Sequence, residues 1–271
     1  MKSRVASLDL AAKRKLLIGV VHLLPLPGSP RWCGNMAAVI NAAKADAVAY
    51  ERGGADAIIV ENFGDAPFAK DAVPAETIAA MAAAGSAVRA AVRLPLGFNV
   101  LRNDAHAALA LCAACGGSFI RVNILSGVMV TDQGVIEGRA FEVLRARRTI
   151  CPEVKILADV HVKHAAPLAP VSIAQVALDT VQRGLADGLI VSGAGTGKAT
   201  DPARALEVKR ACPGVPVLIG SGATAATVHA FDAAADGFIV GSSLKRGGVL
   251  SNPVDSRRVA AMRRAIGEDS R

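Results

Sequence analysis

Residues that could move protons occur at every second position of one apolar segment. Asp159, His161 and Lys163 alternate there with the apolar residues of 156–162. A period of two is typical of a β-strand, so we expect the three side chains to share one face. A lysine in a partly desolvated site has a lowered pKa and can act as a base or form a Schiff base with a carbonyl. The spacing therefore indicates acid–base chemistry.

Polar residues end three other apolar runs in a similar way. Glu61 and Asn99 each end a run, and Arg121 and Asn123 end another. Ionisable side chains are rarely buried without a partner, so this many at one end of a sheet predicts a site. For any single residue the alternative is a structural ion pair, such as Asp159 with Arg121. The catalytic residues that we expect are Glu61, Asp159, His161, Lys163, Arg121 and Asn123.

Two Gly/Ser turns near the C-terminus predict a phosphate site. They follow the short apolar runs 216–219 and 238–240. Glycine lets backbone N–H groups approach an anion, and the N-terminus of a following helix favours negative charge. The alternative is that both are ordinary tight turns. The expected phosphate-binding residues are Gly220, Ser221, Gly222, Gly241 and Ser242.

Signals for other ligands are weaker. Glu61, Asp65 and Asp159 could ligate a divalent cation such as Mg²⁺, but no cofactor or metal ligand is assigned. The run 193–198 matches neither the P-loop nor the dinucleotide-binding spacing, although it could form an anion-binding turn with Lys198 as a point charge. The expected substrate contacts are His22, Asn99, Asp132 and Gly193.

Eight short apolar runs, separated by helical patterns, must position these residues. They are 16–21, 57–60, 96–100, 119–122, 155–160, 188–191, 216–219 and 238–240. Such alternation predicts a parallel sheet, and eight units in one compositional regime predict a closed barrel, in which the turns after strands seven and eight commonly bind phosphate. The fold class that we expect is α/β, a single (β/α)8 TIM barrel over residues 1–271. It has an N-terminal extension (1–15) and a C-terminal helix (253–267).

Two connections in this pattern are long and predict binding loops. One runs over 22–30 and the other over 123–138. Long loops at the catalytic end of a barrel are usually lids or binding loops, and decorative insertion is the alternative. We expect the segment 125–138 to be a lid hinged at Gly127 and Gly134.

Composition excludes several other classes of protein. The 271 residues are 52% hydrophobic and only 3% aromatic, so Ala, Val, Ile and Leu must fill the core. The five cysteines are scattered, and Cys112 with Cys115 lacks a second pair at zinc spacing, which favours a reducing cytoplasm. The net charge of +8 is concentrated near the C-terminus. Without interleaved aromatics it indicates a solvated helix face rather than a nucleic-acid site. No apolar run is long enough to span a bilayer.

Several idiosyncratic blocks make the sequence similar to the BtpA/SgcQ family. They are His22–Pro30, Glu61–Phe68, Asn99–Asp104, Arg121–Asn123, Thr131–Gly134, Ala158–Ala165 and the turn Gly220–Gly222, within residues 16 to about 255. The resemblance implies a β/α barrel. The family is named for a cyanobacterial factor needed for photosystem I accumulation and associated with thylakoid surfaces. The resemblance implies no assignment of catalytic residues, so the expected site follows from the residues alone.

Two functions follow as hypotheses. The first is an enzyme that acts on a small phosphorylated metabolite by proton abstraction, aldol-type cleavage or isomerisation next to a carbonyl. The second is a non-catalytic assembly or biogenesis factor that binds partner proteins or a membrane surface peripherally. The convergence of acid, base and phosphate-type groups favours the enzyme, since a scaffold has no need to desolvate them. We expect a cytoplasmic homo-oligomer.

Overall fold

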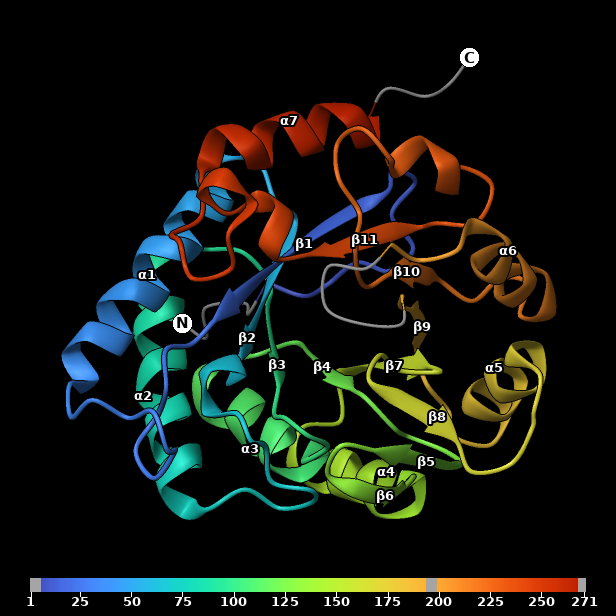
Figure 1. Ribbon diagram of the computed structural model, residues 1–271, viewed down its shortest axis with the longest axis horizontal. Coiled ribbons are helices and arrows are strands. Elements are labelled where there is room, and N and C mark those ends of the chain that lie inside the picture. The colour runs from blue at the N-terminus through green and yellow to red at the C-terminus, as the bar shows by residue number, and fades with distance from the viewer. Residues whose placement is uncertain (1–5, 194–198, 268–271) are drawn as a thin grey trace.

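A computed structural model describes residues 6–193 and 199–267 of the chain as a closed barrel. Eight parallel strands surround the axis in the order β1-β2-β3-β4-β7-β9-β10-β11, and β11 pairs with β1 (Figure 1). They are β1 Leu16–His22, β2 Ala57–Glu61, β3 Leu96–Asn99, β4 Phe119–Val122, β7 Lys155–Val160, β9 Gly188–Val191, β10 Val217–Ile219 and β11 Gly237–Val240. The predicted TIM barrel is confirmed, and each predicted strand overlaps an observed one.

Seven α-helices in the described residues surround the strands (Figure 1). They are α1 Met36–Arg52, α2 Ala75–Ala91, α3 Ala105–Cys115, α4 Ala140–Ile150, α5 Ile173–Gln182, α6 Pro202–Ala211 and α7 Ser256–Gly267. Side chains cap several N-termini. Asp201 accepts a hydrogen bond from the Ala203 N–H, with Pro202 in the first turn of α6. A short 3₁₀ turn (Val228–Phe231) stands between β10 and β11, where the repeating pattern would place an α-helix.

The barrel interior is filled by one side-chain column from each strand. Ile18, Ile59 and Leu157 belong to a buried cluster inside the barrel, whereas the residues between them pack outward against the helices. Glycine on strand β3 leaves space for a large neighbouring side chain. A Cβ on Gly97 would lie 2.4 Å from the Phe119 ring, and Phe119 is fully buried in the interior cluster.

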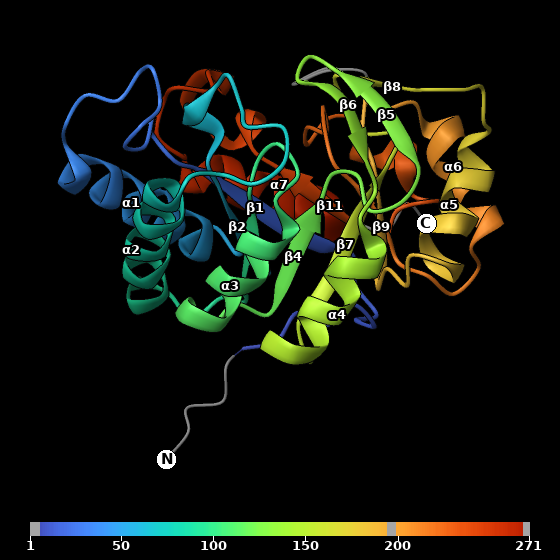
Figure 2. The same cartoon turned by 90° about the horizontal axis from the view of Figure 1, so that it is seen from below.

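A second, three-stranded sheet stands at the carboxyl ends of β4 and β7 (Figure 2). Strands β5 (Val128–Thr131) and β6 (Gly134–Glu137) form an antiparallel hairpin, and β8 (Ala165–Pro167) pairs with β5. The segment that we expected to be a lid loop is therefore already hydrogen-bonded. The sheet has its own small apolar core, made of Ile124, Met129, Ile136 and Val162.

The basic face of α7 is less solvated than the sequence indicated. Val259, Met262 and Ile266 are buried as expected. Arg263, however, does not point into solvent: its Nη1 lies 2.8 Å from Asp56 Oδ2, and its side chain is only 16% exposed. Arg263 and Asp56 thus form an ion pair that joins α7 to the start of β2.

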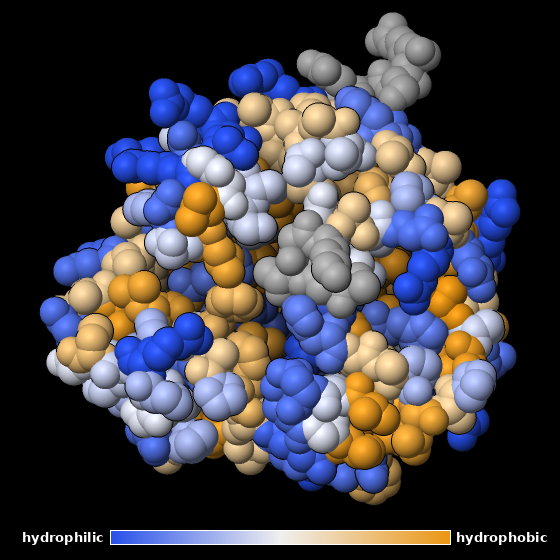
Figure 3. Space-filling model, in the orientation of Figure 1, coloured by the Kyte–Doolittle hydropathy of each residue, from blue (hydrophilic) through white to orange (hydrophobic). Residues whose placement is uncertain are grey.

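The rest of the surface is mixed. On the face in Figure 3, hydrophobic side chains lie in separate patches among hydrophilic ones. Among the described residues, no helix has the length and apolar character needed to cross a membrane.

Cys112 and Cys115 are buried on α3, and the Cys112 thiol donates to the Phe119 carbonyl, which is the packing role expected for them.

Candidate active site

The inward-facing column of each strand ends in a polar residue or a glycine at the carboxyl end of the barrel. The period of two that buries Ile18, Ile59 and Leu157 continues to His22, Glu61 and Asp159. Because all eight strands are parallel, these ends meet at one mouth. The eight positions are His22, Glu61, Asn99, Arg121, Asp159, Ser192, Gly220 and Gly241.

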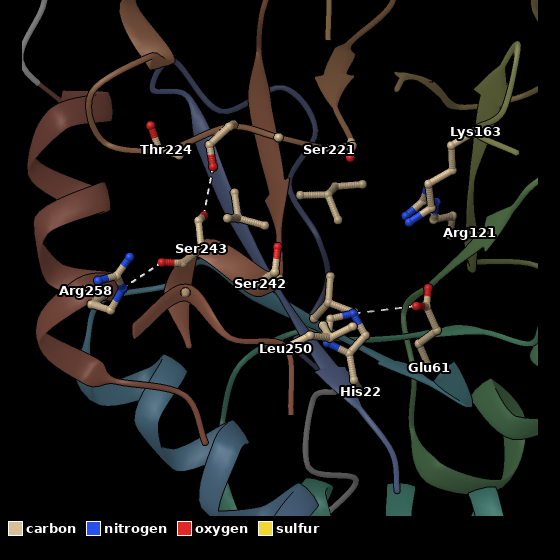
Figure 4. A pocket seen from close by; sticks show the side chains of 18 residues that line it. His22, Glu61, Arg121, Lys163, Ser221, Thr224, Ser242, Ser243, Leu250 and Arg258 are labelled. Carbon is tan, nitrogen blue, oxygen red and sulfur yellow. Dashed lines mark hydrogen bonds and ion pairs between the residues drawn. The ribbon is translucent and has the colours of Figure 1, made fainter. Parts of the chain in front are cut away.

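A cavity of about 330 Å³ opens at this mouth (Figure 4). On one side it is lined by His22, Glu61, Arg121 and Lys163, and on the other by the turns 220–224 and 241–243. Arg258 of α7 completes the second side. Residues expected to react and residues expected to bind phosphate thus line the same cavity.

Arg121 is held from below by a buried carboxylate. Its Nε and Nη2 each donate to Asp159 at 2.8 Å, and Ser192 Oγ donates to the same carboxylate at 3.0 Å. Burial alone would lower the pKa of Arg121, but Asp159 and then Glu61 raise it above its ordinary value. Asp159 has no exposed side-chain surface and lies under the cavity. It positions Arg121 and is not itself open to a ligand.

The ammonium of Lys163 faces the cavity. It makes no hydrogen bond or ion pair with any residue in 6–193 or 199–267. Burial, followed by the positive charge of Arg121, lowers the pKa of Lys163, while Glu61 and Asp159 act in the opposite direction. At a given pH, a larger fraction of Lys163 is therefore in the neutral amine form than for an exposed lysine.

His22 is a neutral imidazole at the cavity wall. Its Nε2 lies 3.7 Å from Glu61 Oε1, and burial, with the charges of Lys245, Lys163 and Arg121, lowers its pKa to about 3. Gly241 makes room for the ring, because a Cβ there would lie 2.5 Å from His22 Cε1. Within the described residues, the buried Nδ1 has no hydrogen-bond partner.

The mouth extends into a second lobe of about 290 Å³, which shares Glu61, Arg121 and Lys163 with the first. Asn123 and Asp132 line this second lobe, and Asp132 comes from the turn of the β5–β6 hairpin. Asn99 lies beneath, where its amide donates to Asn123 Oδ1 and to the Arg121 carbonyl, both at 3.0 Å. Asn99 therefore supports the wall and lines neither lobe.

His161 points away from the mouth, contrary to our expectation. The chain adopts a φ of 52° at His161 and of 57° at His164, so the strand alternation stops at Val160. The ring of His161 instead meets α6, with Nδ1 3.1 Å from Arg204 Nη2. Lys163 still reaches the cavity, but through the turn after β7 and not through strand periodicity.

The carboxylates considered for a cation lie apart. Asp65 accepts from the Leu26 N–H at 2.8 Å and from Asn62 at 3.2 Å, while Asp159 binds Arg121. In residues 6–193 and 199–267, no three His, Cys, Asp or Glu side chains are grouped to hold a metal ion. Gly193 is buried just after β9, and the proposed anion-binding Lys198 falls outside the described residues.

The Gly/Ser turns differ in one respect from the expected phosphate site. No α-helix begins directly after β10 or β11, where the sequence predicted helix N-termini, and only a short 3₁₀ turn, Ser242–Leu244, follows β11. Arg258 supplies positive charge instead. Its Nε donates to the Ser243 carbonyl at 2.7 Å, and Ser243 Oγ donates to the Ala223 carbonyl at 2.8 Å, which joins the two turns. The sequence signal was available, since Arg258 opens the helix that follows the last strand.

A (β/α)8 barrel with a polar cavity at the carboxyl ends of its strands is the class that this fold and site define. The BtpA family model matches residues 13–268, and the chain belongs to that family. It is 50% identical over 252 residues to the photosystem I biogenesis protein BtpA of Synechocystis, covering 93% of this chain and 88% of that one.

The sequence is also similar to proteins of other organisms, and the fold is similar to that of solved β/α barrels. An uncharacterized protein of Pyrococcus furiosus is 49% identical over 250 residues, covering 92% of this chain and 94% of its own. The structure of thiamine phosphate pyrophosphorylase from P. furiosus superposes with a TM-score of 0.58 over 96% of this chain and 98% of that chain, at 14% identity. That likeness establishes the fold alone.

Proposed function

We propose that this protein is an enzyme that acts on a small phosphorylated metabolite by acid–base chemistry at the barrel mouth. One observation carries the proposal: the Gly/Ser turns line the same cavity as Lys163, whose ammonium has no partner among the described residues. Desolvating a lysine costs free energy, and a protein that only bound partners would gain nothing from it.

The phosphate end is formed by the turns after β10 and β11. Gly222 has a φ of 70°, a conformation that glycine adopts without strain. Small residues in both turns bring the backbone close to the cavity, and Arg258 adds a guanidinium at its edge. A phosphate here would meet backbone groups, the Ser242 hydroxyl and one positive charge.

The reacting end contains Lys163, Glu61 and Arg121. With a carbonyl carbon of the substrate nearby, the neutral Lys163 amine takes a proton from the adjacent carbon. The permanent charge of Arg121 stabilises the negative oxygen of the resulting enolate, and Glu61 is placed to exchange a proton with it. Isomerisation follows when the proton returns to a different carbon. Aldol-type cleavage would use the same amine as a Schiff base.

Hydrogen exchange in ²H₂O tests the proton-transfer step without knowledge of the full reaction. Dihydroxyacetone phosphate and ribulose 5-phosphate are incubated with the protein, and loss of the C–H signal next to the carbonyl is followed by NMR. We expect exchange with the wild type and none with Lys163→Met. Borohydride treatment followed by mass spectrometry detects a Schiff base as a covalent adduct on Lys163. Absence of both exchange and adduct, with a ligand shown to bind, would count against the proposal.

The 50% identity to the Synechocystis biogenesis protein supports a second role, as a non-catalytic factor in the biogenesis of a membrane protein complex. The two roles are separable by complementation of a Synechocystis strain that lacks its own BtpA. Restored photosystem I with the wild type but not with Lys163→Met would place the chemistry within the biogenesis role. Equal restoration by both would show that biogenesis does not use this site.

A further inference from the structure

The second lobe of the mouth contains a buried arginine that the phosphate end and the proton-transfer step leave unused. Arg102 lies just after β3, is only 3% exposed, and lines this lobe together with Phe63, Phe68 and Arg31. Its backbone N–H donates to the Ala69 carbonyl at 2.9 Å, so its place is set by the loop after β2.

The Arg102 guanidinium has spare donors. Its Nη2 donates to the Lys163 carbonyl at 2.6 Å, but its buried Nε has no hydrogen-bond partner in the described part of the chain. No carboxylate of residues 6–193 or 199–267 lies within ion-pair distance of it. Arg121 in the same mouth differs, because Asp159 accepts two parallel hydrogen bonds from one edge of its guanidinium. A buried charge without an opposite charge beside it is costly, and a bound anion would relieve that cost.

We propose that Arg102 binds a carboxylate of the substrate, so that the substrate class is a phosphorylated carboxylic acid. This inference rests on the proposed function. A carboxylate is planar and accepts two parallel hydrogen bonds from a guanidinium fork. Glu61 and Asp132 line the same lobe and offset part of its positive charge, which leaves less charge to hold a dianion such as a second phosphate.

The shape of the lobe agrees with this assignment. The rings of Phe63 and Phe68 lie with centroids 6.4 Å apart, giving the carbon chain next to the carboxylate an apolar wall. Lys163, shared by both lobes, stands between the phosphate end and Arg102. With its two ends bound, the substrate would present its middle carbons to Lys163.

Matched pairs of ligands test the carboxylate site by isothermal titration calorimetry. The pairs are 3-phosphoglycerate with glycerol 3-phosphate, and 6-phosphogluconate with glucitol 6-phosphate, which differ in the carboxylate. We expect the acid of at least one pair to bind the wild type about tenfold tighter or more, as one charge-assisted hydrogen bond to a buried group contributes. Arg102→Gln and Arg102→Lys should abolish this difference without weakening the alcohol. Arg258→Gln, the matched control, should weaken both members equally.

The outcomes separate the inference from the proposed function. Equal affinity of acid and alcohol in both pairs would overturn the carboxylate assignment while the phosphate end stands. Fructose 1,6-bisphosphate binding tighter than either acid, with dependence on Arg102, would also overturn it in favour of a second phosphate. No binding of any phosphorylated ligand would contradict the proposed function itself. If Arg102→Gln fails to fold, the affinities of acid and alcohol for the wild type and for Arg102→Lys still test the carboxylate assignment.

Discussion

Arg121 and Asp159 form a two-pronged ion pair beneath the mouth, with both N–O distances at 2.8 Å and no exposed surface on the carboxylate. Such a pair fixes the direction of the guanidinium, because two parallel hydrogen bonds restrain its plane. Ser192 adds a third hydrogen bond to the same carboxylate. Arg121 is therefore a preorganised cation at the place where negative charge would develop in the proposed reaction.

The first prediction concerns stability. Asp159→Ala leaves the Arg121 charge buried without a partner, and removing one member of such a pair typically costs about 3–5 kcal/mol. The free energy of unfolding is measured by urea denaturation. The control is Glu142→Ala, which breaks an exposed ion pair with Arg139 on α4 and should cost no more than about 0.5 kcal/mol. Similar losses in the two variants would mean that the buried pair is not structural.

The second prediction follows from the low pKa of His22. Between its ordinary value of 6.5 and about 3, the unfolded chain takes up a proton that the native ring refuses. The free energy of unfolding should therefore fall as pH falls through this window. Between pH 7 and pH 4.5, His22 alone would account for at most about 3 kcal/mol, at 1.36 kcal/mol per pKa unit.

Urea denaturation of the wild type and His22→Gln at these two pH values isolates this contribution. The variant carries no titrating ring, so its stability should depend less on pH. His106→Gln, at an exposed position on α3, serves as the control and should keep the wild-type pH dependence. A His22 variant as acid-sensitive as the wild type would show that the native imidazole is protonated or exposed.

The third prediction concerns the phosphate end. Gly222→Ala places a Cβ at a φ of 70°, which costs about 1 kcal/mol or more and distorts the turn. Arg258→Gln removes the guanidinium at the cavity edge. Both should weaken glycerol 3-phosphate in calorimetry, Arg258→Gln by about tenfold. Arg257→Gln, next in sequence with a side chain 90% exposed, should bind as the wild type does. Unchanged affinity in the first two variants would move the anion elsewhere.

The fourth prediction concerns the β5–β6 hairpin as a cover. Its amides are hydrogen-bonded across β5, β6 and β8, so Val128–Thr131 should exchange hydrogen as a sheet does even without ligand. Because Asp132 lines the mouth, a bound phosphorylated ligand should slow this exchange further, whereas α1 should not change. Hydrogen–deuterium exchange followed by mass spectrometry, with and without glycerol 3-phosphate, measures the exchange of the hairpin and of α1. Equal exchange with a ligand that binds would show that the hairpin does not close.

The sequence predicted the barrel and much of the mouth because strand periodicity is local. A period of two carries Ile59 to Glu61 and Phe119 to Arg121, and no long-range information is needed. His161 was misplaced where that periodicity fails, since a positive φ in a residue other than glycine has no sequence signal. Arg102 was missed because its position depends on the Ala69 carbonyl and the turn at Lys163, which are distant in sequence.

The connection between β7 and β8 is only four residues long, from 161 to 164, and it joins the barrel to the covering sheet. Lys163 lies within it, tethered on both sides by hydrogen-bonded strands. An insertion or deletion here would move the Lys163 amine relative to Glu61. The same change at the turn of the β5–β6 hairpin would alter only the edge of the mouth near Asp132. Among related chains, the length of this connection should therefore be kept while the hairpin varies in size. A relative with a different spacing would not be expected to carry out the proposed reaction.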